Sequence, residues 1–184
     1  MSYEREHASG KGKPVRRLLR TIRFDGSDAY VYDLAAEPGE WAVSGAFAFS
    51  NAGPGQLVGK TRQAFANGFL GVQTFGRSTF ATVGEATEDD IEAVVLTLAD
   101  HFVTNYGAPS QTAARSAAEA EVAFIEDLVK DAPLNTVFTV RRTFTDDEHK
   151  SRSELREEFR TIKPPTDEPL HARIWTIDAT DDAE

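Results

Sequence analysis

The sequence predicts a single-domain α+β fold, in which about three helices pack on a mainly antiparallel sheet built from hairpins. Runs rich in β-branched and aromatic residues come in pairs separated by short turn sequences, which is typical of antiparallel hairpins. The segments with helical periodicity do not alternate one for one with these runs, which argues against a doubly wound parallel sheet. At 184 residues the chain has the size of one compact domain with tails, so we expect one core.

The first half of the chain begins with a predicted hairpin. The β-rich runs 18–24 and 29–34 flank Asp-Gly-Ser-Asp, which is a good turn composition. The next predicted strand, 41–49, alternates mainly aromatic residues with small ones, so we expect a helix to lie close over its small-residue face. A helix of about three turns is expected over 56–67, with Gly68 as its C-terminal stop.

The centre of the chain predicts two strands and the clearest helix. Strands are expected over 69–75 and 78–83, on either side of a tight connection. Apolar residues then recur at i, i+3, i+4 and i+7 from Ile91 to Tyr106, which is the period of an amphipathic helix. Thr87 is a suitable N-cap for this helix, and the acidic residues that follow it face the positive end of the helix dipole.

A third helix is predicted over 109–131, and a second hairpin follows it. The strands of this hairpin, 136–144 and 155–162, are separated by a purely polar stretch that indicates a long exposed loop. We therefore place the domain at residues 15–164.

Two charged tails flank this domain, namely a flexible basic arm over 1–14 and an acidic tail over 165–184. The acidic tail contains an apolar segment, 170–177, which is too apolar for an idle tail. We expect this segment to be ordered and paired by strand addition, with another chain slightly favoured over its own sheet. The residues expected to bind the partner are Leu170, Ile174, Trp175 and Ile177.

The composition excludes several classes of function. The chain has no Cys, which removes disulfides, thiolate metal sites and a cysteine nucleophile. Residues 1–23 carry seven basic and two acidic groups, hence +5, so the formal net charge of −10 leaves −15 on the remainder. An acidic body repels nucleic acid, which we do not expect as a partner. The sequence shows neither a secretory signal nor an apolar run of about 18 residues, so we expect a cytoplasmic protein that does not enter the membrane.

The string Gly59-Lys60-Thr61 looks like part of a nucleotide site. A phosphate-binding loop has the pattern G-x-x-x-x-G-K-[ST], but here Pro54 stands at the first Gly, removing an amide donor and fixing φ. We expect an exposed Lys60 on the first turns of a helix and no nucleotide. The four His lack the spacing of metal ligands and no G-x-S-x-G elbow is present, so we expect no metal, cofactor or identifiable catalytic residue.

Lys60, Arg77 and Glu121 form the candidate anion-binding or ion-pair corner. Glu121 falls near the inner face of the third helix, and Arg77 lies at the tip between two strands, so the two could pair if both were partly buried. The simpler alternative, which we favour, places Glu121 at the edge of the apolar stripe and Arg77 in an exposed turn.

Four stretches carry a family resemblance: LLRTIRFDGSDAYVYDLAAEPGEWAVSGAFAF, GKTRQAFANGFLGVQTFGRSTFATV, HFVTNYGAP and ELREEFRTIKP. Over residues 17–164 the chain resembles a family of uncharacterised proteins, mainly from alphaproteobacteria, that is classified as a domain of unknown function. The resemblance implies a gene context beside accessory genes of molybdenum-dependent oxidoreductases and a biotin/lipoate-ligase-like protein. It implies no activity and no catalytic residues.

The sequence thus favours a non-catalytic cytoplasmic protein that binds a protein partner, as an accessory or assembly subunit of a larger, oxidoreductase complex. A homo-oligomer would also satisfy the observations. The alternative is a small-molecule or anion-binding domain, or an enzyme, with its pocket near Lys60 and Arg77.

Overall fold

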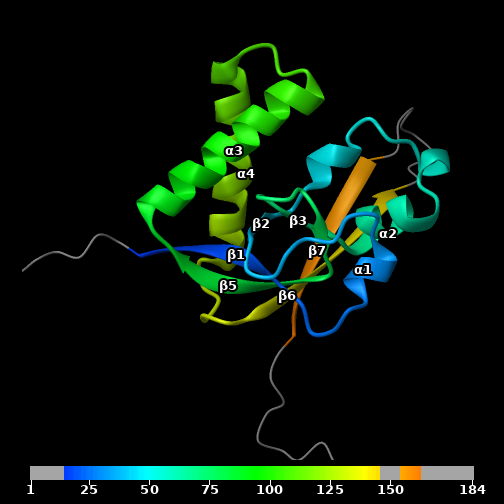
Figure 1. The fold of residues 1–184 in the computed structure, drawn as a ribbon, viewed down its shortest axis with the longest axis horizontal. Coiled ribbons are helices and arrows are strands. Elements are labelled where there is room, and N and C mark those ends of the chain that lie inside the picture. The colour runs from blue at the N-terminus through cyan, green and yellow to red at the C-terminus, as the bar shows by residue number, and fades with distance from the viewer. Residues whose placement is uncertain (1–14, 146–153, 163–184) are drawn as a thin grey trace, which may run out of the picture.

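The computed structural model describes residues 15–145 and 154–162, and these build one seven-stranded sheet (Figure 1). The strands are β1 (Arg16–Ile22), β2 (Trp41–Val43), β3 (Phe69–Gly71), β4 (Arg77–Ser78), β5 (Phe80–Ala86), β6 (Val137–Thr145) and β7 (Glu154–Ile162). Neighbouring strands run antiparallel in the order β4-β3-β2-β1-β5-β6-β7. The predicted α+β class with a mainly antiparallel sheet is confirmed.

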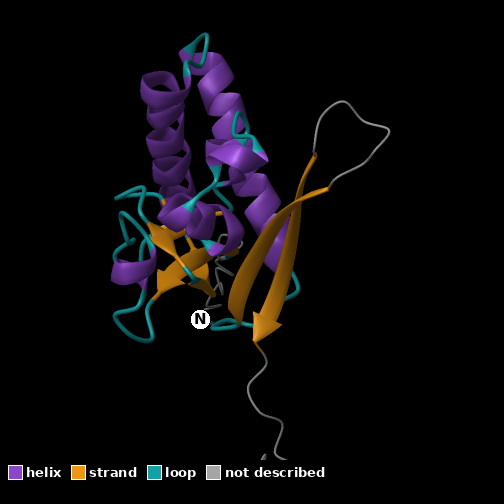
Figure 2. Cartoon of the chain, turned by 90° about the vertical axis from the view of Figure 1, so that its right-hand side faces the viewer, coloured by secondary structure: helices purple, strands orange, loops and turns teal. Residues whose placement is uncertain are grey.

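Two long helices stand over the sheet. The helical elements are α1 (Asp28–Val31), α2 (Gly59–Asn67), α3 (Glu88–Tyr106) and α4 (Gln111–Val129), together with the 3-10 turns η1 (Ala46–Phe49) and η2 (Pro54–Gln56). The helices α3 and α4 lie side by side and pack on β5 and β1, as the two perpendicular views show (Figures 1 and 2). Their length and position give the sheet its main apolar cover.

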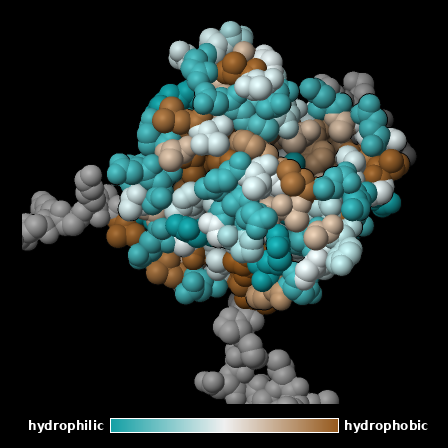
Figure 3. Space-filling model, viewed as in Figure 1, coloured by the Kyte–Doolittle hydropathy of each residue, from teal (hydrophilic) through white to brown (hydrophobic). Residues whose placement is uncertain are grey.

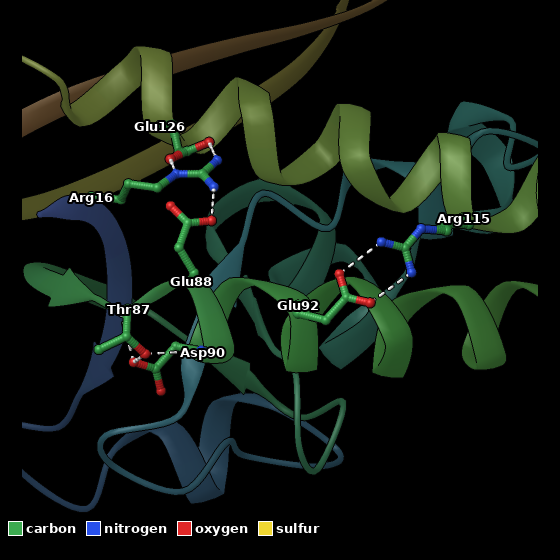
Figure 4. A network of polar contacts seen from close by, with 7 residues as sticks. All are labelled: Arg16, Thr87, Glu88, Asp90, Glu92, Arg115 and Glu126. Carbon is green, nitrogen blue, oxygen red and sulfur yellow. Dashed lines mark hydrogen bonds and ion pairs between the residues drawn. The ribbon is translucent and has the colours of Figure 1, made fainter. Parts of the chain in front are cut away.

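The ends of α3 follow the sequence prediction. Thr87 Oγ accepts a hydrogen bond from the backbone N of Asp90 at 3.1 Å, and the Asp90 carboxylate accepts one from the backbone N of Thr87 at 2.9 Å (Figure 4). This capping box satisfies two amide groups that the helix itself leaves unpaired. Gly107 closes the other end with φ of 66°, a left-handed conformation that suits glycine.

Arg16 fastens both long helices to the sheet. It lies in β1 and donates from Nε to Glu126 of α4 at 2.6 Å and from Nη1 to Glu88 of α3 at 3.0 Å (Figure 4). Farther along the same pair of helices, Arg115 donates to Glu92 through two nitrogens at 2.7 Å each. Bidentate pairs of this kind fix geometry as well as contributing energy.

The predicted hairpin of 18–24 with 29–34 is wrong. Residues after the turn form the short helix α1, and β1 pairs with β2 and β5 instead. The carboxylate of Asp25 accepts a hydrogen bond from the backbone N of Ser27 at 2.8 Å, a local bond that starts a helical turn. Asp28 is 4% exposed and accepts a hydrogen bond from Thr79 Oγ1 at 2.7 Å, which holds α1 against the start of β5.

The predicted strand 41–49 is wrong beyond Val43. Gly45 has φ of 72°, and a Cβ there would lie 2.5 Å from the Cβ of Leu70, so the chain leaves the sheet at a position that only glycine fills. The residues that follow form η1, in which the ring of Phe47 contacts α3 and the ring of Phe49 contacts Phe65 of α2. Phe47 and Phe49 therefore do not share a face, and the alternation of large and small residues reflects this turn.

The neighbouring predictions were right in kind and displaced in extent. The helix expected over 56–67 begins at Gly59, after η2. The strand expected over 69–75 ends at Gly71 because the chain then curls around the buried carboxylate of Glu40, which accepts hydrogen bonds from the backbone N of Gln73 and Thr74 at 3.0 and 2.9 Å. The strand expected over 78–83 runs instead from Phe80 to Ala86.

The predicted second hairpin is confirmed as β6 and β7. The two nine-residue strands keep one register from Val137↔Ile162 to Thr145↔Glu154. In Figure 2 this hairpin projects beside the helices, and β7 forms the outer edge of the described sheet. The loop expected between the strands lies outside the described residues.

The main core lies between the sheet and the two long helices. Its most deeply buried side chains include Leu19, Phe69, Val83, Leu98 and Ile125. On the face shown in Figure 3, apolar side chains lie in small separate groups between hydrophilic ones. No helix in the described ranges is long and apolar enough to cross a bilayer.

Candidate functional site

Arg142 is the most buried charged side chain of the hairpin. It lies in β6 on the same face as the core residues of that strand and is 2% exposed. Its Nε donates to Glu157 Oε1 at 2.6 Å, and its Nη1 donates to the carbonyl oxygens of Phe65 and Gly68 at 2.9 Å each. Its Nη2 donates to the carbonyl oxygen and the hydroxyl of Ser44. All five N–H groups of this guanidinium are therefore used.

Arg77 lies beside Arg142 and is also buried. It is 8% exposed, so the interpretation as an exposed turn residue is wrong. Its Nη1 donates to the carbonyl oxygens of Gly45 and Gly68 at 3.3 and 3.2 Å, and its guanidinium lies 4.8 Å from the ring centre of Phe49. Burial and, next, the positive charge of Arg142 lower the pKa of Arg77 to about 10, so it stays charged at neutral pH.

The inner face of β7 is fixed to the domain by Glu157 and Phe159. Besides its bond from Arg142, Glu157 accepts a hydrogen bond from the hydroxyl of Ser44. Phe159 lies two positions farther along the strand. Its ring centre is 6.2 Å from that of Phe69 and 5.6 Å from that of Phe124. Polar and aromatic contacts thus hold the edge strand in one position.

A cavity of about 330 Å³ lies where η1 meets the facing ends of α3 and α4. Aromatic and small side chains form most of its wall, and Glu121 is its charged member. The residues that line it are Phe47, Ser50, Asn51, Phe102, Tyr106, Ala108, Pro109, Ala113, Ala114, Ala117 and Glu121.

Glu121 is the ionisable group with a pKa near neutrality at this site. Its pKa is raised to about 7, mainly by burial and next by the negative charge of Glu157, while the positive charge of Arg142 opposes both. No hydrogen bond or ion pair of Glu121 is present among the residues that the structure describes. A half-buried carboxyl in this state can exchange a proton near pH 7 or receive a cation.

The opposite face of the hairpin carries exposed arginines. The register places Arg141 opposite Glu158, with Arg156 and Arg160 on either side of Glu158 on the same face. Glu154 lies on this face too, and Arg160 donates to Glu158 at 3.2 Å, so three arginines share the face with two carboxylates. Next to it, residues of α2 and β6 line a polar hollow of about 660 Å³, among them Arg62 and Arg141.

The structure separates the three residues of the predicted corner. Lys60 is exposed as expected and lies 3.4 Å from the carbonyl oxygen of Tyr32, while Arg77 is bound to carbonyl groups in the interior. Glu121 lines the cavity on α4 and is influenced by Arg142, so Arg77 is not its nearby cation. The predicted partner-binding segment 170–177 lies outside the described residues and stays a prediction.

Three residues of the site, Ser44, Arg142 and Glu157, were not predicted from the sequence. The alternation of the strand at 136–144 does contain a signal for Arg142, because it stands in phase with two core residues, Phe138 and Val140. Its acceptors come from distant parts of the chain, which no spacing rule connects.

The fold and site define an antiparallel α+β domain whose edge hairpin is locked by a buried arginine–carboxylate pair. The chain belongs to a family of unknown function, DUF6505, which it matches over residues 16–176. No curated protein matches the chain. No solved structure matches it.

Proposed function

We propose that this protein is a non-catalytic cytoplasmic accessory or assembly subunit, which binds an extended segment of a partner protein along the edge of β7. The observation that carries the proposal is the position of β7: in the described part of the chain, no strand pairs with its outer side. An unpaired edge is a template for strand addition, in which backbone hydrogen bonds provide affinity. From the gene context that the family resemblance implies, we propose an oxidoreductase complex as the larger assembly.

The hydrogen bonds between β5 and β6 fix which way the backbone of the hairpin faces. Val83 donates to the carbonyl of Thr136 at 3.0 Å and accepts from the backbone N of Asn135 at 2.9 Å, so Val83 faces β6. Backbone groups of antiparallel strands alternate in direction, so Ala81 also faces β6 and meets Phe138, its partner in the register. Even-numbered residues of β6 are thereby turned toward β5, and odd-numbered ones toward β7.

The same alternation identifies the free backbone groups of β7. The odd-numbered residue Thr139 is in register with Arg160, so even-numbered residues of β7 bond to β6. The residues whose N–H and C=O groups point outward are Leu155, Glu157, Phe159 and Thr161.

The charge of the hairpin indicates the chemistry of the partner. Arg141, Arg156 and Arg160 lie on one open face with two carboxylates, Glu154 and Glu158, so positive charge is in excess there. An added strand places every second side chain over this face. We therefore expect a partner segment with acidic residues at alternate positions, whose charges complement the arginines.

The locked position of β7 favours such binding. Because Glu157 and Phe159 already hold the strand against the domain, little backbone freedom remains to be lost when a partner pairs with it. A mobile hairpin would lose part of the binding energy in becoming ordered.

Residue-resolved amide hydrogen exchange tests the proposal, with the partner obtained by copurification from the native host. In the free protein, we expect the even-numbered amides of β7 to be protected and the amides of Leu155, Glu157, Phe159 and Thr161 to exchange quickly. In the complex, these four amides should become protected. If they exchange equally fast with and without the partner, the proposal is wrong.

Exchange in the free protein identifies the other occupants of the edge. Protection that is present without a partner and independent of dilution would mean that the chain's own segment pairs with β7. Protection that disappears on dilution would mean that a second copy does. Either result would contradict binding of a partner protein at this edge.

A further inference from the structure

The cavity beside Glu121 is separate from the outer edge of β7 and has the properties of a small-molecule site. Its volume of about 330 Å³ falls at the lower end of the range for ligand pockets. It opens between η1 and the ends of α3 and α4 that the α3–α4 connection joins. A ligand there would contact three parts of the chain at once.

Aromatic rings form one wall of this cavity. Phe47 of η1 makes edge contacts with Phe102 and Tyr106 of α3, at ring-centre distances of 4.8 and 5.3 Å. The opposite wall consists of short side chains of α4, whose methyl groups leave room for an apolar body: Ala113, Ala114 and Ala117. These walls suit an aromatic or aliphatic group of modest size.

The charged end of the cavity is a carboxylate without a cation of its own. The cation whose charge acts on Glu121 is Arg142, and all five of its N–H groups are donated to Glu157, Ser44, Phe65 and Gly68. Arg142 could turn to Glu121 only by giving up bonds to buried acceptors. Within the described ranges, Glu121 itself makes no ion pair.

We propose that this cavity binds a small organic ammonium ion, whose charged group lies on Glu121 and whose apolar body lies between the aromatic rings and the alanines. The ammonium supplies the hydrogen-bond donors that Glu121 lacks. The ring of Tyr106 adds a favourable electrostatic contact to a cation near its face. Ser50 and Asn51 line the same cavity and offer polar groups to the ligand.

The surrounding charges select against an anion. Glu121 lines the cavity, and the negative charge of Glu157 is close enough to influence it. The positive charges of Arg142 and Arg77 are bound to a carboxylate and to carbonyl oxygens in the interior. An anionic ligand would therefore meet an unshielded carboxylate and no free cation from the described lining.

Binding of an ammonium ion is coupled to the proton of Glu121. Burial raises the pKa of Glu121 to about 7, so the group is mostly ionised at pH 8 and mostly protonated at pH 6. The other ionisable groups that face it are Arg142 of β6, Glu157 of β7 and Tyr106 of α3. A simple amine stays protonated at both pH values, so its affinity should fall about tenfold from pH 8 to pH 6.

The test uses phenethylamine as the probe, with 2-phenylethanol and 3-phenylpropionate as its neutral and anionic counterparts. Titration is followed by the NMR shifts of the alanines of α4 and by calorimetry. We expect phenethylamine to shift Ala113, Ala114 and Ala117 and to bind at least about tenfold more tightly than 2-phenylethanol. The phenylpropionate should not bind.

Variants on one helix provide the control. Glu121→Gln keeps the shape of the side chain and should remove both the preference for the amine and its pH dependence. Glu119→Gln makes the same change at an exposed position of α4 and should leave both unchanged. The proposal is overturned if phenethylamine, butylamine and tryptamine all fail to shift these alanines at millimolar concentration. Equal binding of phenethylamine by Glu121→Gln and the unaltered protein would overturn it too.

Discussion

Replacing Arg142 with methionine tests whether the buried guanidinium holds the edge hairpin in place. Methionine fills much of the same space and removes every donor. The substitution leaves the Glu157 carboxylate without its cation, and it leaves the carbonyl oxygens of Ser44 and Phe65 without a donor from Arg142. The carbonyl of Gly68 keeps its bond from Arg77 at 3.2 Å.

The expected loss of stability is large because the Arg142–Glu157 ion pair is largely shielded from water. The side chains of Arg142 and Glu157 are 0% and 18% exposed. Removing one member of a buried ion pair costs about 3–5 kcal/mol, since the other charge stays buried without compensation. For a chain of this length, that loss lowers Tm by about 6–20 °C.

Urea unfolding followed by circular dichroism measures this loss, with Arg141→Met as the matched control. Arg141 is the next residue of β6 and points to the open face, so its replacement should leave the midpoint unchanged within error. The double variant R142M/E157Q also removes the unpaired charge of the Glu157 carboxylate and should recover part of the stability. A loss below about 1 kcal/mol for Arg142→Met would refute the structural role of the pair.

Three further predictions follow from single positions. Gly45→Ala should destabilise the protein strongly, because a Cβ there would lie 2.5 Å from the Cβ of Leu70. Gly39→Ala has φ of 87° but open space around it, so it should cost only about 1–2 kcal/mol for its backbone strain. Equal losses of stability in denaturant unfolding would contradict this. The pKa of Glu121 is raised in the fold to about 7 from 4.5, so the stability it contributes is present below pH 4.5 and is lost as the pH rises through 7. Glu121→Gln should therefore gain stability relative to the unaltered protein, by on the order of 3 kcal/mol between pH 4.5 and 8, and a pH-independent difference would disprove the shift. Thr161→Pro removes an outward N–H group, so it should abolish partner binding while the domain keeps its Tm. Arg160→Pro removes a backbone hydrogen bond to β6 and should lower Tm. The reverse result would show that the backbone directions of β7 are assigned wrongly.

The long helices were predictable because their signals are local. The capping box at Thr87, the apolar stripe that begins at Ile91 and the left-handed Gly107 all lie within one stretch of chain. The hairpin of β6 and β7 was predictable for the same reason, since a polar stretch separates two β-rich runs.

The first hairpin could not be predicted because tertiary contacts override its strand propensity. Residues 29–34 have β-forming side chains, but Asp25 starts a helical turn and Asp28 is held by Thr79, far along the chain. The break at Gly45 likewise depends on the close approach of Leu70, which the sequence around Gly45 does not contain.

The site was predictable only in part. Glu121 could be identified from the sequence because it lies beside the apolar stripe of its helix, and in the structure it lines the cavity. The residues around it could not be identified. Arg142 donates hydrogen bonds to residues 44, 65, 68 and 157, which come from distant parts of the sequence and lie together only in the folded chain. The ion pair considered between Glu121 and Arg77 does not form, because the Arg77 guanidinium donates to backbone carbonyl oxygens instead.

Glu157 connects the two proposed sites. Its backbone faces the free edge of β7, while its carboxylate lies on the inner side, binds Arg142 and raises the pKa of Glu121. Because burial is the larger cause of that raised pKa, Glu157→Gln should bring the pKa of Glu121 only part of the way back to its usual value. The same substitution leaves the outward N–H and C=O groups of β7 in place. A change in the pH dependence of amine binding on Glu157→Gln would show that the cavity senses the charge of this side chain. Partner binding should weaken only as far as the bond from Arg142 holds β7 in place, because the outward backbone groups are unchanged.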